Sequence, residues 1–300
     1  MRICANKNRI WGISMKTKLK RSYYRKDFQV FISIIVVLAM IFSFIPLFIT
    51  VLNALKSNYE INANIFAFPN IDAFWEDIKF NFSTAWGAIE TSFISTILLS
   101  IVGGVVNCLL GSILAYIFTY KDFYGKNGIF LAFISVMMLP SIMGMPILVP
   151  FVKNTLGLGG TYIGYLLPNF AGGQVAALFL LRTFFGQQPK AVYESARIDG
   201  ASDVAIYLRI TVPMAFPIIL YYFVGAFASY YNDYLWASLI LGEKMTMMPK
   251  MLAQQETFVA LSQNGAMYAM YIISAIPIVC TSIISMKYFK DGEFAAGMKL

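Results

Sequence analysis

The sequence predicts an all-α membrane protein with about six membrane-spanning helices, and three observations support this fold class. Hydrophobic residues make up 59% of the chain and charged residues only 13%, whereas soluble domains carry about 25% charged residues. The apolar residues come in runs of about 20, the length that an α-helix needs to cross a bilayer. No stretch shows the alternation of polar and apolar residues that is typical of membrane β-strands.

The first two predicted spans are separated by a polar segment. The first apolar run covers residues 28–55, and residues 56–87 contain Pro69 and several acidic residues. The second span is expected within residues 89–118, a stretch long enough to cross the bilayer at a tilt.

The third span, residues 129–152, is interrupted by Pro140, Pro146 and Pro150. Prolines at this density kink a helix and free backbone polar groups. Because free polar groups are costly in lipid, we expect this span to face other helices rather than lipid.

The remaining spans are expected over residues 162–185, 213–235 and 268–288. A polar segment, residues 186–212, separates the fourth span from the fifth, and residues 236–265 form an outer loop. Pro213 and Pro217 open the fifth span and, like the prolines of the third, are candidate pivots for a conformational change. Fixed kinks that do not move are the alternative interpretation.

The distribution of basic residues predicts that both termini are cytoplasmic. Six spans put both ends on one side, and a cytoplasmic N-terminus places eighteen of the 23 Lys and Arg residues in inner segments. Nine of them precede the first span, so residues 1–27 form a basic cytoplasmic flank that faces anionic lipid. This explains the net charge of +8 without a nucleic-acid partner. Met15 is an alternative start to Met1 and would remove part of this flank.

The composition also excludes some classes of functional site. The chain contains no His, which excludes His-based metal sites and His general-base catalysis. Cys4, Cys108 and Cys280 are far apart and two of them lie in apolar runs, so we interpret them as buried apolar residues. No metal or cofactor site is expected in this chain.

The polar segment before the fifth span begins with a predicted helix outside the membrane. Pro189 suits the first turn of a helix. Residues 191–198 favour helix, with Glu194 and Arg197 as neighbours at i,i+3.

A sharp turn and a second helix follow. Gly200 can adopt a positive φ and end the first helix. Ser202 is a good N-cap for a helix over residues 203–210, and Asp203 suits the positive end of that helix. A helix that merely lies on the bilayer surface is the alternative interpretation of this segment.

The same segment carries a recognisable signature. It reads Glu194-Ser195-Ala196, then Asp199-Gly200-Ala201, and finally Ile210-Thr211-Val212-Pro213. In order, spacing and position before the fifth span, it resembles the Glu-Ala-Ala…Gly…Ile-x-Leu-Pro motif of ABC importer permeases. Ser195 and Val212 replace the usual Ala and Leu.

The resemblance implies that this loop is a coupling helix seated in a groove on a separate ATPase. It implies a charged contact at Glu194, close packing at Ala196 and a turn at Gly200. The implied docking set is Glu194, Ser195, Ala196, Arg197, Asp199, Gly200 and Ala201.

The chain has no P-loop of its own. Its only Gly-Lys pair, Gly125-Lys126, is followed by Asn127 instead of the Ser or Thr that a phosphate-binding loop requires. ATP and Mg²⁺ are therefore expected on partner ATPase chains.

Other segments resemble the maltose and multiple-sugar branch of the same family. They read Ala115-Tyr116-Ile117-Phe118, Leu180-Leu181-Arg182-Thr183-Phe184-Phe185 and Tyr231-Asn232-Asp233-Tyr234-Leu235-Trp236. The tail, residues 289–300, is similar to the C-terminal pattern of this branch, although Glu293 and Leu300 depart from it. The resemblance implies tail contacts with the ATPase at Asp291, Gly292, Gly297 and Lys299.

The segment after the fifth span is a candidate part of the translocation path. Tyr231, Asn232, Asp233 and Trp236 supply the aromatic faces, amide and carboxylate that commonly hold sugars. Asp233 lies about 20 residues beyond Pro213, or roughly 30 Å along a helix, which places it near the outer mouth. An aromatic belt, a helix cap and a contact with the delivering binding protein are alternative interpretations.

The sequence thus predicts the permease subunit of an ATP-driven importer in the bacterial cytoplasmic membrane, with an oligosaccharide as cargo. Its expected partners are a second homologous permease, two ABC ATPase subunits, an extracellular solute-binding protein and lipid. An ABC permease for a glycerophosphodiester or a peptide is the nearest alternative. A secondary carrier is disfavoured because the spans hold almost no charge, and a membrane enzyme because no catalytic constellation is visible.

Overall fold

The computed structural model describes residues 26–242, 247–253 and 263–290, and every regular element in these ranges is a helix. Four of the described helices are long and apolar enough to cross a membrane, and the number rises to six if each of two bent pairs is one span. The predicted class, all-α with about six spans, is confirmed. Contacts divide the chain into two units, residues 1–49 and 50–300, which are described separately.

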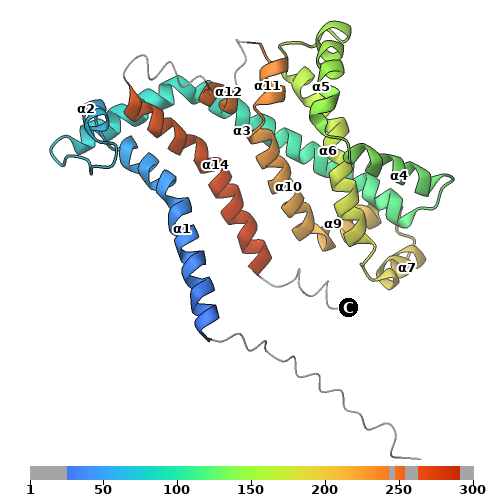
Figure 1. Cartoon of the computed structure of the whole chain (residues 1–300). Helices are drawn as coiled ribbons and strands as arrows, with labels where there is room; N and C mark the ends of the chain where they lie inside the picture. Colours follow the sequence, from blue (N-terminus) through green and yellow to red (C-terminus); the bar gives the residue numbers. More distant parts are fainter. Residues whose placement is uncertain (1–25, 243–246, 254–262, 291–300) are drawn as a thin grey trace, which may run out of the picture. The chain divides into compact units, whose positions relative to one another are not determined.

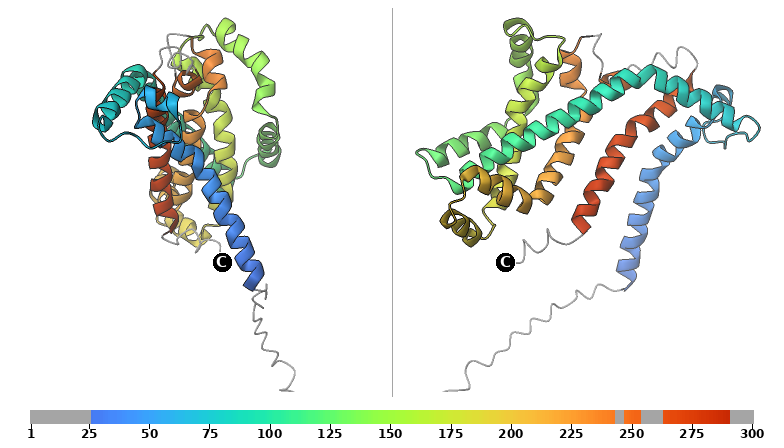
Figure 2. Two further views of the ribbon diagram at one scale, coloured as in Figure 1. Left: turned by 60° about the vertical axis from the view of Figure 1, so that its left-hand side comes forward. Right: turned by 180° about the vertical axis from the view of Figure 1, so that it is seen from behind.

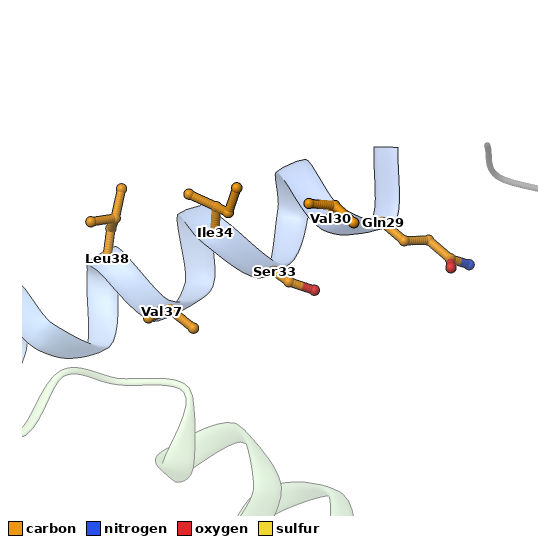
Figure 3. Close-up of a pocket in the computed structure, with 6 residues that line it drawn as sticks. All are labelled: Gln29, Val30, Ser33, Ile34, Val37 and Leu38. Carbon is orange, nitrogen blue, oxygen red and sulfur yellow. The ribbon is translucent and has the colours of Figure 1, made fainter. Parts of the chain in front are cut away.

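The described part of the first unit is one apolar helix. α1 (Lys26–Ala54) continues into the second unit, and its residues 28–48 are all exposed. Figure 3 shows residues that line an open hollow along this helix, with Ile34 and Leu38 projecting to the same side. A helix that is apolar all round requires lipid or another protein around it rather than water.

The longest element of the second unit is α3 (Phe74–Tyr120), which has 47 residues. At 1.5 Å per residue it is about 70 Å long, more than twice the thickness of a bilayer core. The predicted second span lies inside it. The helix begins well before that span, where Phe82 and Ala85 pack into a core with residues of α14, and Glu76 and Asp77 lie at its positive end.

Three helices pack along α3. The most extensive contacts of α3 are with α6 (Tyr162–Phe185), followed by α10 (Phe216–Tyr231) and α14 (Asn264–Lys290), as Figures 1 and 2 show. α6 has the predicted bounds of the fourth span, and α14 includes the predicted sixth span.

The Pro-rich third span is broken into three pieces. α4 (Lys126–Met137) and α5 (Ser141–Pro150), which continues into the π-helix η1 (Phe151–Thr155), meet at 91°. The prediction that this span faces other helices is confirmed in part. α4 and α5 have no buried residue, but Phe130 and Phe133 pack against a core that α3 and α6 line, and Val152 in η1 is buried. The freed backbone groups find partners locally. Near the break, for example, the N–H of Leu139 donates to the carbonyl of Val136 at 3.1 Å.

The fifth span is shorter than predicted. α9 (Val212–Met214) contains Pro213, the chain bends by 77° at Ala215, and α10 starts at Phe216 and ends at Tyr231. A separate helix, α11 (Leu235–Ile240), follows. The bends at the two Pro-rich sites agree with the predicted kinks; their role as pivots stays a prediction.

At the N-terminal end of α3, asparagine side chains join several segments. Nδ2 of Asn81 donates to the backbone carbonyls of Ala54 at 3.0 Å and Lys56 at 2.8 Å. α2 (Asn58–Ala63) and the start of α14 meet through a bond from the N–H of Gly265 to Oδ1 of Asn58 at 3.0 Å. Thr96 holds α12 (Met248–Ala253) by accepting from the N–H of Met248 at 2.7 Å.

One of the cysteine predictions is wrong. Cys108 is buried between α3 and its neighbours, as expected, but Cys280 is exposed. Its neighbours Ile276, Val279 and Ile283 are also at least half exposed, so this side of α14 is an apolar strip suited to lipid or another chain. Cys4 lies outside the described residues.

Candidate functional site

The candidate site is the bent segment between α6 and α10, here called the elbow (residues 189–211). Its first limb is α7 (Lys190–Ile198), whose bounds agree with the predicted helix. Gly200 adopts φ 79°, and its N–H donates to the carbonyl of Arg197 at 3.1 Å. The N–H of Ala201 donates to the carbonyl of Ala196 at 3.0 Å. This pair of bonds is a Schellman motif, which requires a left-handed residue at the position that Gly200 occupies.

The second limb of the elbow begins with the predicted α-helix and then continues as a π-helix. Oγ of Ser202 accepts from the N–H of Ala205 at 3.3 Å and caps α8 (Asp203–Ile206). The chain then winds as the π-helix η2 (Tyr207–Thr211). A regular α-helix is disfavoured here because Pro213 has no N–H and its ring would clash with the carbonyl of Arg209.

Most of the predicted docking residues lie on an open face of the elbow. Glu194, Ser195, Arg197, Asp199 and Gly200 are exposed. Beside them, Ile198 is 87% exposed, more than the other exposed large apolar side chains of the elbow. Sequence reasoning did not single out Ile198, although its place between Arg197 and Asp199 in a short helix is the signal that was available.

The two alanines of the predicted set face the other way. Ala196 and Ala201 are half-buried and pack against a core that α3, α6 and the start of α10 also line. Their small size therefore lets the elbow sit close to its own chain.

The first limb of the elbow is fixed to the end of α3 by two tyrosines and a glutamine. The rings of Tyr120 and Tyr193 are stacked, with their centroids 4.3 Å apart. The Tyr193 hydroxyl donates to Oε1 of Gln188, and the Tyr120 hydroxyl has two acceptors within reach, the carbonyl of Phe185 at 2.9 Å and Oε1 of Gln188 at 3.1 Å. Tyr193 and Gln188 are both buried. The sequence did not reveal this attachment, because Tyr120 and Gln188 are 68 positions apart in the chain.

An ion-pair cluster joins the two limbs and the end of α3. Asp203 pairs with Lys121, which follows α3, and lies 3.9 Å from a guanidinium nitrogen of Arg197. Arg197 thus meets Asp203 across the turn, whereas the sequence suggested Glu194 as its neighbour. All three side chains are partly exposed, so each contact contributes at most about 1 kcal/mol.

A third contact reaches deeper along α3. The hydroxyl of Tyr207, in η2, lies 2.7 Å from Oγ of Ser112. The ring of Tyr207 also meets that of Tyr116 edge to face, with centroids 5.4 Å apart. Nothing in the sequence pattern indicated this pairing, which spans 95 positions of the chain.

Most of the candidate translocation residues form hydrogen bonds to other parts of the chain. Tyr231 is buried and its hydroxyl donates to the carbonyl of Ser274 at 2.8 Å. Trp236 is buried, and its indole N–H donates to the carbonyl of Tyr165 at 3.0 Å. Oδ1 of Asp233 accepts from the N–H of Trp236 at 3.1 Å, which supports its role as a cap for α11. Asn232 is exposed at the end of α10.

Other predicted features lie outside the described residues. These are the tail residues Asp291, Gly292, Gly297 and Lys299 and most of the basic flank, residues 1–25. Among the residues that are described, no three His, Cys, Asp or Glu side chains are grouped as metal ligands would be.

Comparison with known proteins agrees with this architecture. A family model described as "Binding-protein-dependent transport system inner membrane component" matches residues 107–292, which include the whole elbow. The inner membrane ABC transporter permease protein YcjP of Escherichia coli (strain K12) is 30% identical over 211 residues, covering 69% of this chain and 74% of YcjP. The arabinooligosaccharides transport system permease protein AraQ of Bacillus subtilis (strain 168) is 27% identical over 265 residues, covering 85% of this chain and 90% of AraQ.

A solved structure has the same fold. It is the crystal structure of a bacterial ABC transporter involved in the import of the acidic polysaccharide alginate, and one of its chains matches with a TM-score of 0.74 and 22% identity. The match covers 89% of this chain and 99% of that one. Family members are transport permeases of the inner membrane, which in general work with a partner permease, an ATPase and a binding protein. The chain described here belongs to this family, the inner membrane components of binding-protein-dependent transport systems.

Proposed function

We propose that this permease carries a carbohydrate, and that its elbow is the docking surface for a separate ABC ATPase. The observation that carries the docking proposal is the two-sidedness of the elbow. Its front exposes Glu194, Ile198 and Asp199, while on its back the buried ring of Tyr193 stacks on Tyr120 of α3. A segment that is open in front and fixed behind suits a contact through which a partner moves the helices.

The chemistry of the front face fits a protein groove better than a bilayer surface. Ile198 supplies an apolar side chain, and the exposed acids Glu194 and Asp199 flank it. Arg197 is exposed beside these acids, so the face carries both signs of charge. A protein groove can pair with both signs, whereas the anionic lipids of a cytoplasmic leaflet attract basic side chains and repel acidic ones. The proposed sidedness of the elbow, cytoplasmic, follows from the distribution of Lys and Arg.

The proposed cargo is an oligosaccharide. This rests on the segments that resemble the sugar branch and on the similarity to AraQ, a permease of an arabinooligosaccharide system. Because Tyr231 and Trp236 are buried, we infer that they hold α10 and α11 in place. Asn232 is then the member of the set that is open to contact a passing solute.

The docking proposal is tested by co-purification. Glu194→Lys and Gly200→Pro are each expressed with the partner subunits, with Glu76→Lys, an exposed acid at the opposite end of α3, as the control. We expect both elbow variants to insert into the membrane but to lose the ATPase, while the control keeps it. Wild-type amounts of ATPase bound to either elbow variant would refute the proposal.

The cargo is tested separately by identifying the ligand of the cognate binding protein. We expect this ligand to be an oligosaccharide, and we expect the same oligosaccharide to compete with the solute that the complete transporter takes up. A glycerophosphodiester or a peptide as ligand would replace the carbohydrate proposal and leave the docking proposal intact.

A further inference from the structure

The two limbs of the elbow are connected through a row of aromatic rings on α3. Tyr207 in η2 meets Tyr116, whose ring lies 5.2 Å from that of Tyr120, four residues further along α3. Tyr120 in turn stacks on Tyr193 in α7. A continuous row of four rings, here called the tyrosine row (Tyr207, Tyr116, Tyr120 and Tyr193), therefore joins the second limb to the first along one face of α3.

A buried hydroxyl pair fixes the deep end of the tyrosine row. Ser112 is 3% exposed, and its hydroxyl donates to the carbonyl of Leu109 at 3.0 Å. Either hydroxyl can be the donor in the 2.7 Å contact between them, and the arrangement that satisfies both contacts of Ser112 has Tyr207 as the donor, because Ser112 has a single hydrogen to give to Leu109. Tyr207 thus donates into a buried acceptor that is already oriented by its own helix.

The spacing of these contacts makes the attachment rigid. Ser112 and Tyr120 are eight positions apart on α3, a rise of about 12 Å. One contact would let the elbow rotate about it, whereas contacts at both ends of this stretch prevent rotation. At the other end of the elbow, the chain bends by 77° at Ala215 before α10 begins.

We propose that Tyr207, with Ser112 as its acceptor, is the positioning residue that makes the second limb of the elbow move together with α3. The proposal rests on the docking function of the elbow and names the helix that receives the motion. ATPase closure displaces the elbow, the tyrosine row passes the displacement to α3, and Ala215 absorbs the change of angle toward α10.

α3 carries such a motion to the opposite end of the second unit. Asn81, near its N-terminus, holds the backbone at Ala54 and Lys56, and Thr96 holds Met248. These contacts connect α3 with the segments that follow the first span and precede the sixth. A displacement at Ser112 therefore reaches both segments through one continuous helix.

Two substitutions separate this role from a purely structural one. Tyr207→Phe keeps the ring contact with Tyr116 and leaves Ser112 bonded to Leu109, so it removes only the donor. Ser112→Ala leaves the Tyr207 hydroxyl without its acceptor, and Ser112→Thr restores an acceptor. Tyr124→Phe is the matched control, because Tyr124 is fully exposed near the same end of α3.

The measurement is the number of solute molecules imported per ATP by the reconstituted complete transporter. We expect Tyr207→Phe to lower this ratio about three- to tenfold, the range that the loss of one hydrogen bond corresponds to, while the ATPase still co-purifies. Ser112→Ala is expected to lower it at least as much, Ser112→Thr to retain most of it, and Tyr124→Phe to match the wild type. An additional effect of Ser112→Ala on the Tyr207→Phe background would argue against the pair acting as one unit.

Two outcomes overturn the proposal. The first is a wild-type import ratio for Tyr207→Phe in a transporter that retains its ATPase. The second is an equal loss in Tyr124→Phe, which would show that any tyrosine change near this end of α3 has the same effect. Failure of the docking proposal looks different, since Glu194→Lys would then keep the ATPase bound.

Discussion

The ring of Tyr193 stacks on that of Tyr120 with centroids 4.3 Å apart, although 73 positions of the chain separate them. This contact joins α7 to the last turn of α3 and sets which face of the elbow is open. The exposed acids and Ile198 face outward because Tyr193 occupies the inner side of the same short helix.

Tyr193→Ala is expected to loosen the elbow without unfolding the membrane helices. The variant loses a stacked ring pair, which is worth about 0.5–1.5 kcal/mol beyond the area it buries. We expect faster tryptic cleavage after Lys190 and Arg197 in the detergent-solubilised protein, followed by mass spectrometry of the fragments. Tyr124→Ala, at a fully exposed ring, should cleave at the wild-type rate; equal acceleration in both would contradict a specific role for the stack.

Gly200→Ala is expected to weaken the turn of the elbow by about 1–2 kcal/mol, the cost of placing a residue with a Cβ in the left-handed region. Space is not the obstacle, since a Cβ at Gly200 would meet nothing within 4 Å. ATPase binding should fall about five- to thirtyfold in a titration of the permease pair with ATPase. Gly128→Ala, also in open space but within a regular helix, is the control and should bind normally.

The Lys121–Asp203 pair is expected to respond to charge exchange. Lys121→Glu places two acids together and should reduce ATPase-dependent import, because the second limb is pushed away from α3. The exchange variant Lys121→Glu with Asp203→Lys should recover most of the activity. The partial exposure of both groups predicts that the defect of the single variant shrinks as salt is raised; a defect that salt leaves unchanged would point to a cause other than charge.

Asn81→Ala is expected to lower the stability of the second unit at the end of α3 opposite the elbow. It leaves the buried carbonyls of Ala54 and Lys56 without their donor, at a cost of about 1–3 kcal/mol. We expect a clear fall in the midpoint of thermal unfolding in detergent. Asn232→Ala, at an exposed amide that bonds only within α10 among the residues described, should change the midpoint little; an equal fall in both variants would contradict the assignment.

The local parts of the elbow were predictable from sequence because each depends on residues that are close in the chain. Pro189, Gly200 and Ser202 act within one turn of the helix ends that they mark, and the structure confirms all three ends. The motif around Glu194 also led to the correct family. Local chemistry of this kind requires no knowledge of what packs behind the segment.

The attachment of the elbow to α3 was not predictable in the same way. The contact of Tyr120 with Tyr193 and Gln188 forms only after α3, α6 and α7 have packed. The spacing of apolar residues along a helix shows which side of that helix is buried, but not which neighbouring helix that side will contact. The third span was predictable in one respect. Its prolines correctly predicted a break, but the sequence did not show that local turns would supply the hydrogen bonds of the freed backbone groups.

The central claim, that an ATPase docks on the open face of the elbow, is tested most directly by photo-crosslinking in living cells. A photoreactive amino acid is placed at Ile198, which is 87% exposed on that face, and, as a control, at Trp75, which is 78% exposed at the other end of α3. We predict that position 198 crosslinks to the ATPase subunit and position 75 does not. Crosslinks from position 198 to lipid or to the extracellular binding protein, with none to the ATPase, would contradict the account.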